Sequence, residues 1–454
     1  MSRGGDALTE LLLGIDVGTS ACKAAVVDAD GTEIAHGQVP TPWEPVSTGA
    51  EVDPDALLAA VVSAASEAIA RAPAGRVAGI GVTSVAEIGM LFDVVGRVLH
   101  RPVAWHDARG AAEAQALARD LPDFSEHTGL PASALCSLAK LKHLGTAGAA
   151  RWLNVGEWIV HRLGGRQVSE LSLSSRTGLL DLEPRAPYDD ALAWAGLPGD
   201  LLAEVAFAGT DAGRSDGATL PGTAGAVLTV AGHDHLVAGV GVGVIAPGDL
   251  LDSCGTAEAL MRVVAPPLDA AARRQAVDGG VTVGWHLAEG RQALLAGVWS
   301  GLALREVLDE LTAGGSTREQ LSAGALAIAP GDAPALELDL HSLERSPVRL
   351  PAGAPAAVWR GAIDAVAREV EAVVAHIDAV AGPHTKVVVT GGWARDAAVF
   401  DVKRRLGAIE APPVVEAGCR GAALLSGVAA GVYASADDLP AVGRVGNDMT
   451  KEPA

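Results

Sequence analysis

Short apolar runs that end at polar, glycine-containing turns dominate the start of the chain and predict β-strands. Residues 11–17 form one such run, and residues 22–28 and 32–39 form two more. Their spacing predicts a three-stranded antiparallel meander. Asp53 and Pro54 then supply an N-cap and a first-turn proline for an alanine-rich helix that extends to about residue 72.

The alternation of strand and helix patterns continues to the end of the chain and predicts an α/β fold. A strand at residues 227–232 is followed by His233, Asp234 and His235 and then by a glycine-rich helix to residue 242. Further strands are predicted at residues 77–84, 279–285, 292–298 and 386–390, and further helices at residues 110–120, 137–144, 151–163, 300–311, 356–380 and 419–431.

Composition and charge exclude several classes of protein. With 454 residues the chain exceeds the usual size of one hydrophobic core, so we expect about two or three domains. Its net charge of −21 repels nucleic acid and anionic membrane surfaces. The four cysteines form no C-x-x-C pair and predict neither a zinc site nor a disulfide framework. No leader pattern and no membrane-spanning apolar run is found, so we expect a cytoplasmic protein.

The turn that follows residues 11–17 has the chemistry of a phosphate site. Gly18 lets backbone N–H groups approach an anion, and the hydroxyl groups of Thr19 and Ser20 add donors. Asp16 can bind Mg²⁺, usually through a water molecule. A hairpin with a glycine corner is the alternative reading.

A second stretch repeats this pattern, with Ser253, Gly255 and Thr256 after another apolar run. Two phosphate-type turns, one in each half of the chain, predict a duplicated domain that closes on one nucleotide. We place the boundary near Gly243, which gives domains of residues 1–243 and 244–454.

Asp234 is the candidate general base. A buried carboxylate between the end of a strand and the start of a helix can accept the proton of a hydroxyl group that attacks the γ-phosphate of a nucleotide. The alternative reading takes His233, Asp234 and His235 as zinc ligands. Adjacent residues of a strand point to opposite faces and no fourth ligand follows, which argues against a zinc site.

Residues 105–109 present an aromatic face and an ion pair just after a strand, through Trp105, Asp107 and Arg109. Their alternative reading is a helix start with Asp107 as N-cap. Glu87, Asp107 and Asp234 together would repel an anion, and we expect the nearby Arg109 to be paired with Asp107. If these residues line one site, that site would suit a neutral polyol or short ketose.

These stretches, taken in order, resemble the FGGY family of carbohydrate kinases within the actin-like ATPase superfamily. The resemblance extends from about residue 11 to about residue 433 and includes A-G-H-D-H at residues 231–235 and V-V-V-T-G-G-W-A-R-D at residues 387–396. It implies two ribonuclease-H-like domains that flank a catalytic cleft. It also implies an enzyme that uses ATP and Mg²⁺ to phosphorylate a hydroxyl group of a small neutral sugar or polyol, with a homodimer as a candidate assembly.

The resemblance implies roles for individual residues. Glu87, counted back from Asp93, aligns with the glutamate that glycerol kinases of the family use to bind a substrate hydroxyl, whereas ketopentose kinases have histidine there; a solvated loop carboxylate is the alternative. Asp234 would be the catalytic base and Asp16 the metal ligand. The implied sugar-binding residues are Glu87, Trp105, Asp107, Arg109, Asp234 and His235, and the implied nucleotide-binding residues are Gly18, Thr19, Ser20, Ser253, Gly255, Thr256, Gly391, Gly392 and Asp396.

Three positions depart from the family pattern. His143 stands where tryptophan is usual, Asp396 where asparagine is usual and Asp401 where glutamine is usual. These departures leave a sugar-sensing pseudokinase as an alternative, beside an actin-like ATPase that phosphorylates no small molecule. The W-x-D-x-R stretch at residues 105–109 and Asp234 argue against the ATPase, because hydrolysis of ATP alone requires neither.

Overall fold

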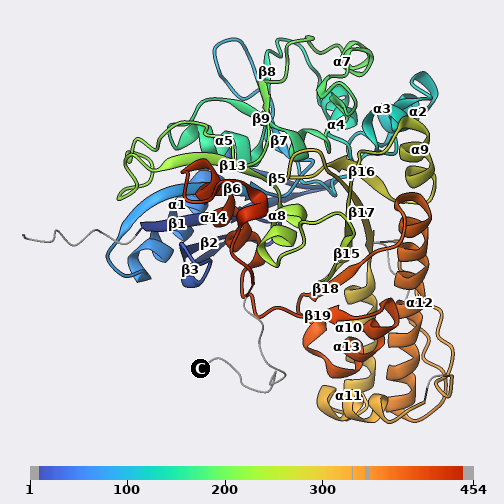
Figure 1. The fold of residues 1–454 in the computed structure, drawn as a ribbon. Helices are drawn as coiled ribbons and strands as arrows, with labels where there is room; N and C mark the ends of the chain where they lie inside the picture. The colour runs from blue at the N-terminus through green and yellow to red at the C-terminus, as the bar shows by residue number, and fades with distance from the viewer. Residues whose placement is uncertain (1–9, 330, 343–347, 443–454) are drawn as a thin grey trace, which may run out of the picture.

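The computed structural model describes residues 10–329, 331–342 and 348–442, and it confirms the predicted α/β class. Two mixed β-sheets lie in two halves of the molecule, with helices against their faces (Figure 1). Residues 10–233 supply the strands of the first sheet and residues 249–410 those of the second. The boundary predicted near Gly243 lies in the connection between the sheets and stays a prediction.

The first sheet has five strands in the order β13-β6-β1-β2-β3. The predicted meander is confirmed: β1 (Glu10–Val17), β2 (Ala21–Asp28) and β3 (Glu33–Pro40) are antiparallel. β6 (Arg76–Ser84) pairs in parallel with β1. β13 (Val227–His233) in turn pairs in parallel with β6. Asp16 lies opposite Thr83, and Ser84 lies opposite His233. The carboxyl ends of the three parallel strands therefore meet at one edge of the sheet.

The predicted helix after residue 53 is α1 (Pro54–Arg71), and the carboxylate of its N-cap Asp53 accepts a hydrogen bond from the N–H of Ala56. Before it, β4 (Trp43–Val46) and β5 (Gly49–Val52) form a hairpin that the sequence pattern did not predict. The other elements of this half are β7 (Gly89–Phe92), α2 (Ala111–Asp120), α3 (Phe124–Thr128), α4 (Ser137–Leu144), β9 (Val168–Glu170), α6 (Leu171–Ser174), β10 (Leu180–Asp181), β11 (Ala186–Pro187), α7 (Asp189–Ala195) and β12 (Glu204–Ala206).

The helix predicted at residues 151–163 is wrong in its first turn. Residues Arg151–Asn154 form β8, which pairs with β7 so that Phe92 lies opposite Arg151. The helix α5 (Val155–Arg162) begins only after Asn154, whose N–H donates to the carboxylate of Glu157 at 2.7 Å. This capping contact fixes the helix start, so the preceding residues are free to pair as a strand.

The second sheet has six strands in the order β16-β17-β15-β14-β18-β19. Its parallel pair is β14 (Asp249–Cys254) and β18 (Lys386–Thr390), in which Ser253 lies opposite Thr390. The remaining elements are α8 (Asp234–Gly241), β15 (Glu258–Val264), α9 (Ala270–Asp278), β16 (Thr282–Trp285), β17 (Gln292–Val298), α10 (Ser300–Ala313), α11 (Arg318–Leu326), α12 (Pro355–Ala381), the 3₁₀ turn η1 (Trp393–Arg395), α13 (Ala397–Lys403) and β19 (Ile409–Glu410).

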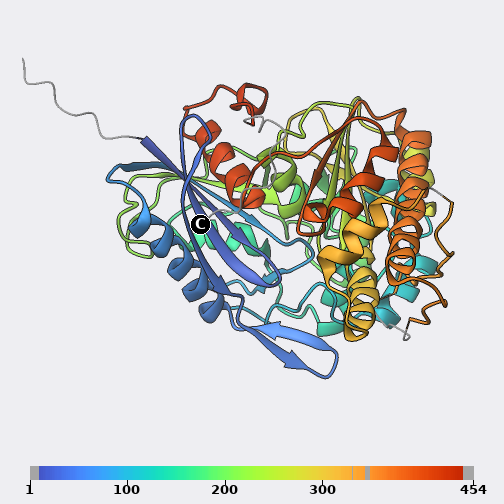
Figure 2. The same ribbon diagram turned by 90° about the horizontal axis from the view of Figure 1, so that it is seen from below.

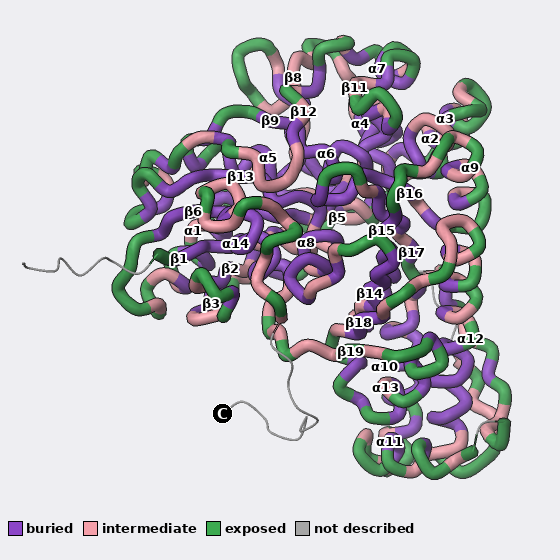
Figure 3. Tube along the Cα trace, viewed as in Figure 1, coloured by how far each residue is buried: buried purple, intermediate pink, exposed green. Residues whose placement is uncertain are grey.

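The helix α14 (Ala417–Ala429), near the C-terminal end of the described chain, returns to the first sheet (Figure 2). It approaches so closely that a Cβ atom on Gly14 would lie 1.8 Å from the carbonyl oxygen of Cys419, and one on Gly81 1.9 Å from that of Ala422. Most residues of β1, β6 and β13 in the first sheet, of β14 and β15 in the second, and of α14 are buried (Figure 3). Within the described ranges, no helix is both long enough and apolar enough to cross a membrane.

Candidate active site

Asp16 lies at the carboxyl edge of the first sheet, one residue before β1 ends. Its Oδ1 atom is buried and has no hydrogen-bond partner. Burial raises the pKa of Asp16 to about 7, and the carboxylate of Asp234 adds to the rise, while Lys23 opposes it. A buried carboxylate oxygen without a partner suits a cation or its bound water, so the geometry of Asp16 fits the Mg²⁺ that a phosphate site requires.

Two tryptophan side chains hold the first phosphate-type turn in place. The indole N–H of Trp43 donates to the carbonyl oxygen of Thr19 at 2.7 Å, and that of Trp105 donates to the Thr19 hydroxyl at 3.1 Å. The Gly18 carbonyl accepts a hydrogen bond from Thr41, and Ser20 is exposed. The turn is therefore fixed from one side, and the Thr19 hydroxyl connects it to the predicted sugar-binding tryptophan.

Asp234 is the first residue of α8 and directly follows β13. Its Oδ1 atom accepts a hydrogen bond from the N–H of His235 at 2.7 Å. Burial raises the pKa of Asp234, and His235 offsets this rise only in part. Burial also holds the pKa of His233 well below its usual value, so its imidazole, 3.2 Å from Asp234, is neutral. A carboxylate whose proton affinity is raised in this way is a stronger general base.

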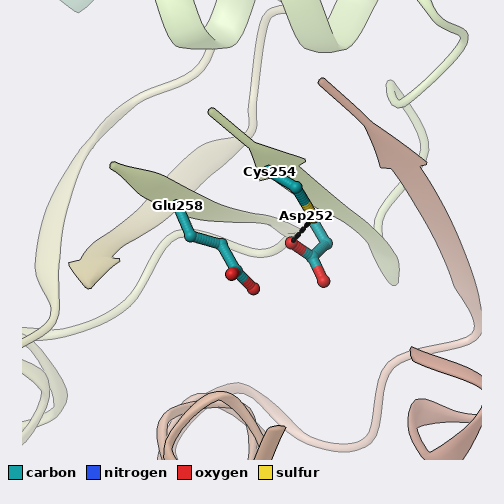
Figure 4. Close-up of side chains that lie close together, drawn as sticks. All are labelled: Asp252, Cys254 and Glu258. Atoms are coloured by element: carbon teal, nitrogen blue, oxygen red, sulfur yellow. Dashed lines mark hydrogen bonds between the residues drawn. The ribbon is translucent and has the colours of Figure 1, made fainter. Parts of the chain in front are cut away.

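The zinc reading of His233, Asp234 and His235 gains no support from the side chains. Over the described residues, the metal-like cluster of three ligand atoms is formed instead by Asp252, Cys254 and Glu258 (Figure 4). In that cluster the ammonium group of Lys403 lies 2.8 Å from Asp252 and also contacts Glu258. A lysine cation thus takes the position in which a metal would bind.

Glu87 follows β6 and has a left-handed backbone, with φ of 62°. Its carboxylate accepts a hydrogen bond from Nε of Arg176 at 2.8 Å, and Nη1 of Arg176 donates to the Thr282 hydroxyl on β16 at 2.7 Å. Arg176 therefore connects the two halves of the molecule beside Asp234. The sequence argument missed this cation, because its partners are 89 and 106 residues away along the chain.

Asp107 and Arg109 form the predicted ion pair, but Asp107 has no free oxygen. Nε and Nη2 of Arg109 donate to its two carboxylate oxygens at 2.8 and 2.9 Å, and Thr48 donates to Oδ2 at 3.1 Å. Burial alone would raise the pKa of Asp107, but these bonds hold it below its usual value. Since Arg109 also pairs with Glu51 at 2.5 Å, both residues brace the loop that carries Trp105. Their contact with a sugar stays a prediction.

Trp105 faces a tryptophan from the other half of the molecule. The rings of Trp105 and Trp299 are stacked, with centroids 6.1 Å apart and an interplanar angle of 9°. Behind Trp105, the buried ammonium group of Lys140 donates to its carbonyl oxygen at 2.7 Å, and burial lowers the pKa of Lys140 to about 8. Lys140 lies on α4, and its ammonium group faces the protein interior and not the solvent. The same helix carries His143, at which the family usually has tryptophan. Trp299 is a second residue that sequence reasoning missed.

The second phosphate-type turn lies between β14 and β15. Ser253 is half-buried and Thr256 exposed, and the Gly255 N–H donates to the carbonyl oxygens of Ser253 and Ala257 at 3.0 and 3.1 Å. The Gly391-Gly392 turn passes over it, because a Cβ atom on Gly391 would lie 2.4 Å from the Cys254 carbonyl oxygen. Gly391 also has φ of 93°, which favours glycine.

Asp396 lies farther along the same segment as the N-cap of α13. Its Oδ1 atom accepts hydrogen bonds from the Ser322 hydroxyl at 2.7 Å and the Ala398 N–H at 3.0 Å, and its Oδ2 atom accepts one from Arg318 at 3.2 Å. Its side chain is 1% exposed, so the carboxylate is used within the protein. A contact between Asp396 and a nucleotide stays a prediction. Asp401 lies exposed on the same helix.

Sequence comparisons agree with this arrangement. The family model described as "FGGY family of carbohydrate kinases, N-terminal domain" matches residues 11–241. The glycerol kinase of Allorhizobium ampelinum is 32% identical over 263 residues, a stretch that covers 54% of this chain and 52% of that protein. The matched stretch thus spans about half the length of that relative. The glycerol kinase of Bordetella parapertussis is 28% identical over 499 residues, covering 98% of this chain and 93% of that protein.

Comparison with solved structures supports the same fold. The structure of xylulose kinase from Rhodospirillum rubrum has a TM-score of 0.86, with 22% identity over 98% of this chain and 94% of that chain. The prediction of two domains of the actin-like ATPase fold is therefore confirmed at the level of the fold.

Proposed function

Because this chain belongs to the FGGY family of carbohydrate kinases, we propose that it transfers the γ-phosphoryl group of ATP to a hydroxyl group of a small neutral polyol or ketose. The observation that carries the proposal is the meeting of three carboxyl groups at one sheet edge. Asp16 lies near the end of β1, and Glu87 and Asp234 follow the parallel strands β6 and β13. The charge of Asp234 raises the pKa of Asp16, and the charge of Glu87 raises that of Asp234.

In this proposal Asp234 accepts the proton of the substrate hydroxyl as its oxygen attacks the γ-phosphorus. The N–H of His235, which donates to Oδ1, holds the carboxylate at the start of α8 and leaves Oδ2 for the substrate. The raised pKa of Asp234 favours its taking up this proton. Turnover should therefore rise with pH as Asp234 loses its own proton.

ATP would lie between the two phosphate-type turns. Gly18, Thr19 and Ser20 would bind its phosphates from one side, and Ser253 and Thr256 from the other. Mg²⁺, when bound, supplies positive charge that neutralises the phosphates. Asp16 is the residue suited to hold it, because its buried Oδ1 has no other partner. The Gly391-Gly392 turn would lie along the adenosine.

The ion pair of Glu87 with Arg176 and the stacked rings of Trp105 and Trp299 favour a neutral substrate. Glu87 is paired with Arg176, so the two form a neutral donor and acceptor pair beside Asp234. Such a pair can accept one hydrogen bond from a substrate hydroxyl and donate another. The stacked rings of Trp105 and Trp299 offer apolar surface for C–H groups. Glycerol and short ketoses combine these properties.

A coupled ADP-release assay tests the proposal. The purified protein is incubated with ATP, Mg²⁺ and one acceptor at a time: glycerol, xylulose, ribulose, gluconate or none. The proposal expects ADP release that depends on a neutral acceptor. Release without any acceptor would favour the actin-like ATPase, no release with sugar binding would favour the pseudokinase, and gluconate as best acceptor would refute the neutral pocket.

A homodimer is a candidate assembly of this kinase. Multi-angle light scattering of the purified protein, with and without acceptor, measures its mass directly and tests that part of the proposal.

A further inference from the structure

A buried ionic cluster lies directly under the second phosphate-type turn. Asp252 and Cys254 on β14 and Glu258 on β15 point to the same side of the hairpin, because Cys254 lies opposite Glu258 and Asp252 is two residues before it (Figure 4). Their ligand atoms all lie within 4.8 Å of one another. Asp252 and Glu258 flank the turn, one before it and one after it.

Lys403, the last residue of α13, supplies the cation of this cluster. Its Nζ atom lies 2.8 Å from Asp252 Oδ2 and is hydrogen-bonded to Glu258 Oε1, and its side chain is 2% exposed. The Ser300 hydroxyl donates to the other oxygen of Glu258 at 2.7 Å. A buried lysine between two carboxylates, each with further partners, is well placed to fix the elements that carry them.

The two phosphate-type turns differ in how their aspartates are neutralised. Asp16, before the first turn, keeps a buried oxygen with no partner. Asp252, before the second turn, also has a buried oxygen that accepts no hydrogen bond, but this oxygen forms an ion pair of 2.8 Å with Lys403. The first turn can therefore take up an external cation, whereas the second has a permanent internal one.

The cluster also joins the parts of the proposed nucleotide site. Lys403 ends the helix that follows the Gly391-Gly392 turn, and Gly391 lies against Cys254 in the cluster. On the other side, Ser300 directly follows Trp299, which stacks on Trp105. Displacement of Lys403 would loosen the phosphate turn from the adenosine turn.

We propose that Lys403 is a positioning residue for the second phosphate turn, residues 253–256, because its ammonium group ties both strands of that turn to α13. The proposal rests on the proposed function, in which this turn binds the phosphates of ATP. Lys403 itself touches no substrate. It acts by holding Ser253 and Thr256 of the turn at the positions that the phosphates require.

The test titrates wild type and Lys403→Met with the fluorescent nucleotide N-methylanthraniloyl-ADP in the presence of Mg²⁺. We expect the dissociation constant of this nucleotide to rise about tenfold or more, because the turn loses its anchor and two buried carboxylates are left facing each other. The KM for the polyol should change less than about twofold. Nucleotide binding equal to wild type, or equal losses in both constants, would overturn the proposal.

The matched control is Lys386→Met. Lys386 also joins β14 and β18, through Asp249 at 3.4 Å, but at the opposite end of the strand pair from the turn. We expect this variant to bind the fluorescent nucleotide as wild type does. A similar weakening in Lys386→Met would assign the effect to the sheet as a whole and would overturn the specific role of Lys403.

A second variant keeps the charge of the cluster and remains decisive if Lys403→Met does not fold. Lys403→Met with Glu258→Gln removes one positive and one negative charge, and the glutamine oxygen can still accept from Ser300. We expect nucleotide binding to stay weak; recovery to the wild-type value would show that Lys403 only neutralises charge. If no polyol is phosphorylated by wild type, the proposed function fails, while the nucleotide titration still decides the role of Lys403.

Discussion

Replacing Asp16 with asparagine should abolish turnover and at the same time stabilise the metal-free protein. The Oδ1 atom of Asp16 is buried, and the pKa of this residue is raised from 3.8 to about 7 by removal from water. This rise of about 3 pH units corresponds to about 4 kcal/mol at 1.36 kcal/mol per unit. Because the folded state binds the proton more tightly than the unfolded state, wild-type stability declines as pH rises from about 4 to about 7. Asparagine cannot ionise and avoids this loss.

Urea unfolding in EDTA, followed by tryptophan fluorescence at several pH values, measures the effect. The free energy of unfolding of Asp16→Asn minus that of wild type should increase by up to about 4 kcal/mol between about pH 4 and pH 8, so that the variant becomes the more stable protein. Added Mg²⁺ should reduce the difference, because it stabilises only the carboxylate. Asp55→Asn is the control, since the side chain of Asp55 is 85% exposed. A difference that does not vary with pH, or turnover above about half of wild type, would refute the reasoning.

Substitutions at three further positions test the acceptor side of the site. Asp234→Asn should lower kcat by about 10²–10⁴ with both substrates still bound, as stopped-flow and binding titrations can show; near-normal kcat would remove Asp234 from the role of base. Glu87→Ala should raise the KM for the polyol far more than the KM for ATP, because it removes a hydrogen-bond acceptor and leaves Arg176 without its carboxylate. Steady-state kinetics with both substrates varied measure the two constants, and an unchanged KM for the polyol would contradict this prediction. Trp299→Ala should raise the KM for the polyol up to about tenfold, because the aromatic contact with Trp105 is worth about 0.5–1.5 kcal/mol. Trp299→Phe should retain most of the affinity, and equal effects of the two substitutions would contradict this role of the aromatic ring.

Local chemistry explains why parts of the site could be predicted from the sequence. Gly18 and Thr19 follow an apolar run directly, so both the strand and the turn are encoded within a few residues. Asp234 likewise lies at a visible change from strand to helix pattern. The fold class followed from the same alternation, repeated along the chain.

Features that depend on distant partners could not be predicted in this way. Arg176 lies in a segment of small and hydroxyl residues, and only the fold shows that Glu87 and Thr282 reach it. Lys403 has the sequence context of a surface helix, next to two arginines, yet carboxylates about 150 residues earlier make it one of the most buried side chains. Trp299 likewise becomes part of the site only through its contact with Trp105.

The return of α14 to the first sheet has a consequence for how the protein is made. Gly14 and Gly81 leave the space that Cys419 and Ala422 fill, so the face of the first sheet is completed by residues near the C-terminal end of the chain. During synthesis, the strands of that sheet leave the ribosome long before α14 does and must wait with this apolar face uncovered. The nascent N-terminal half is therefore exposed to aggregation until α14 has been made. A fragment ending before α14 should behave in the same way, and should regain its fold when α14 is supplied as a separate peptide.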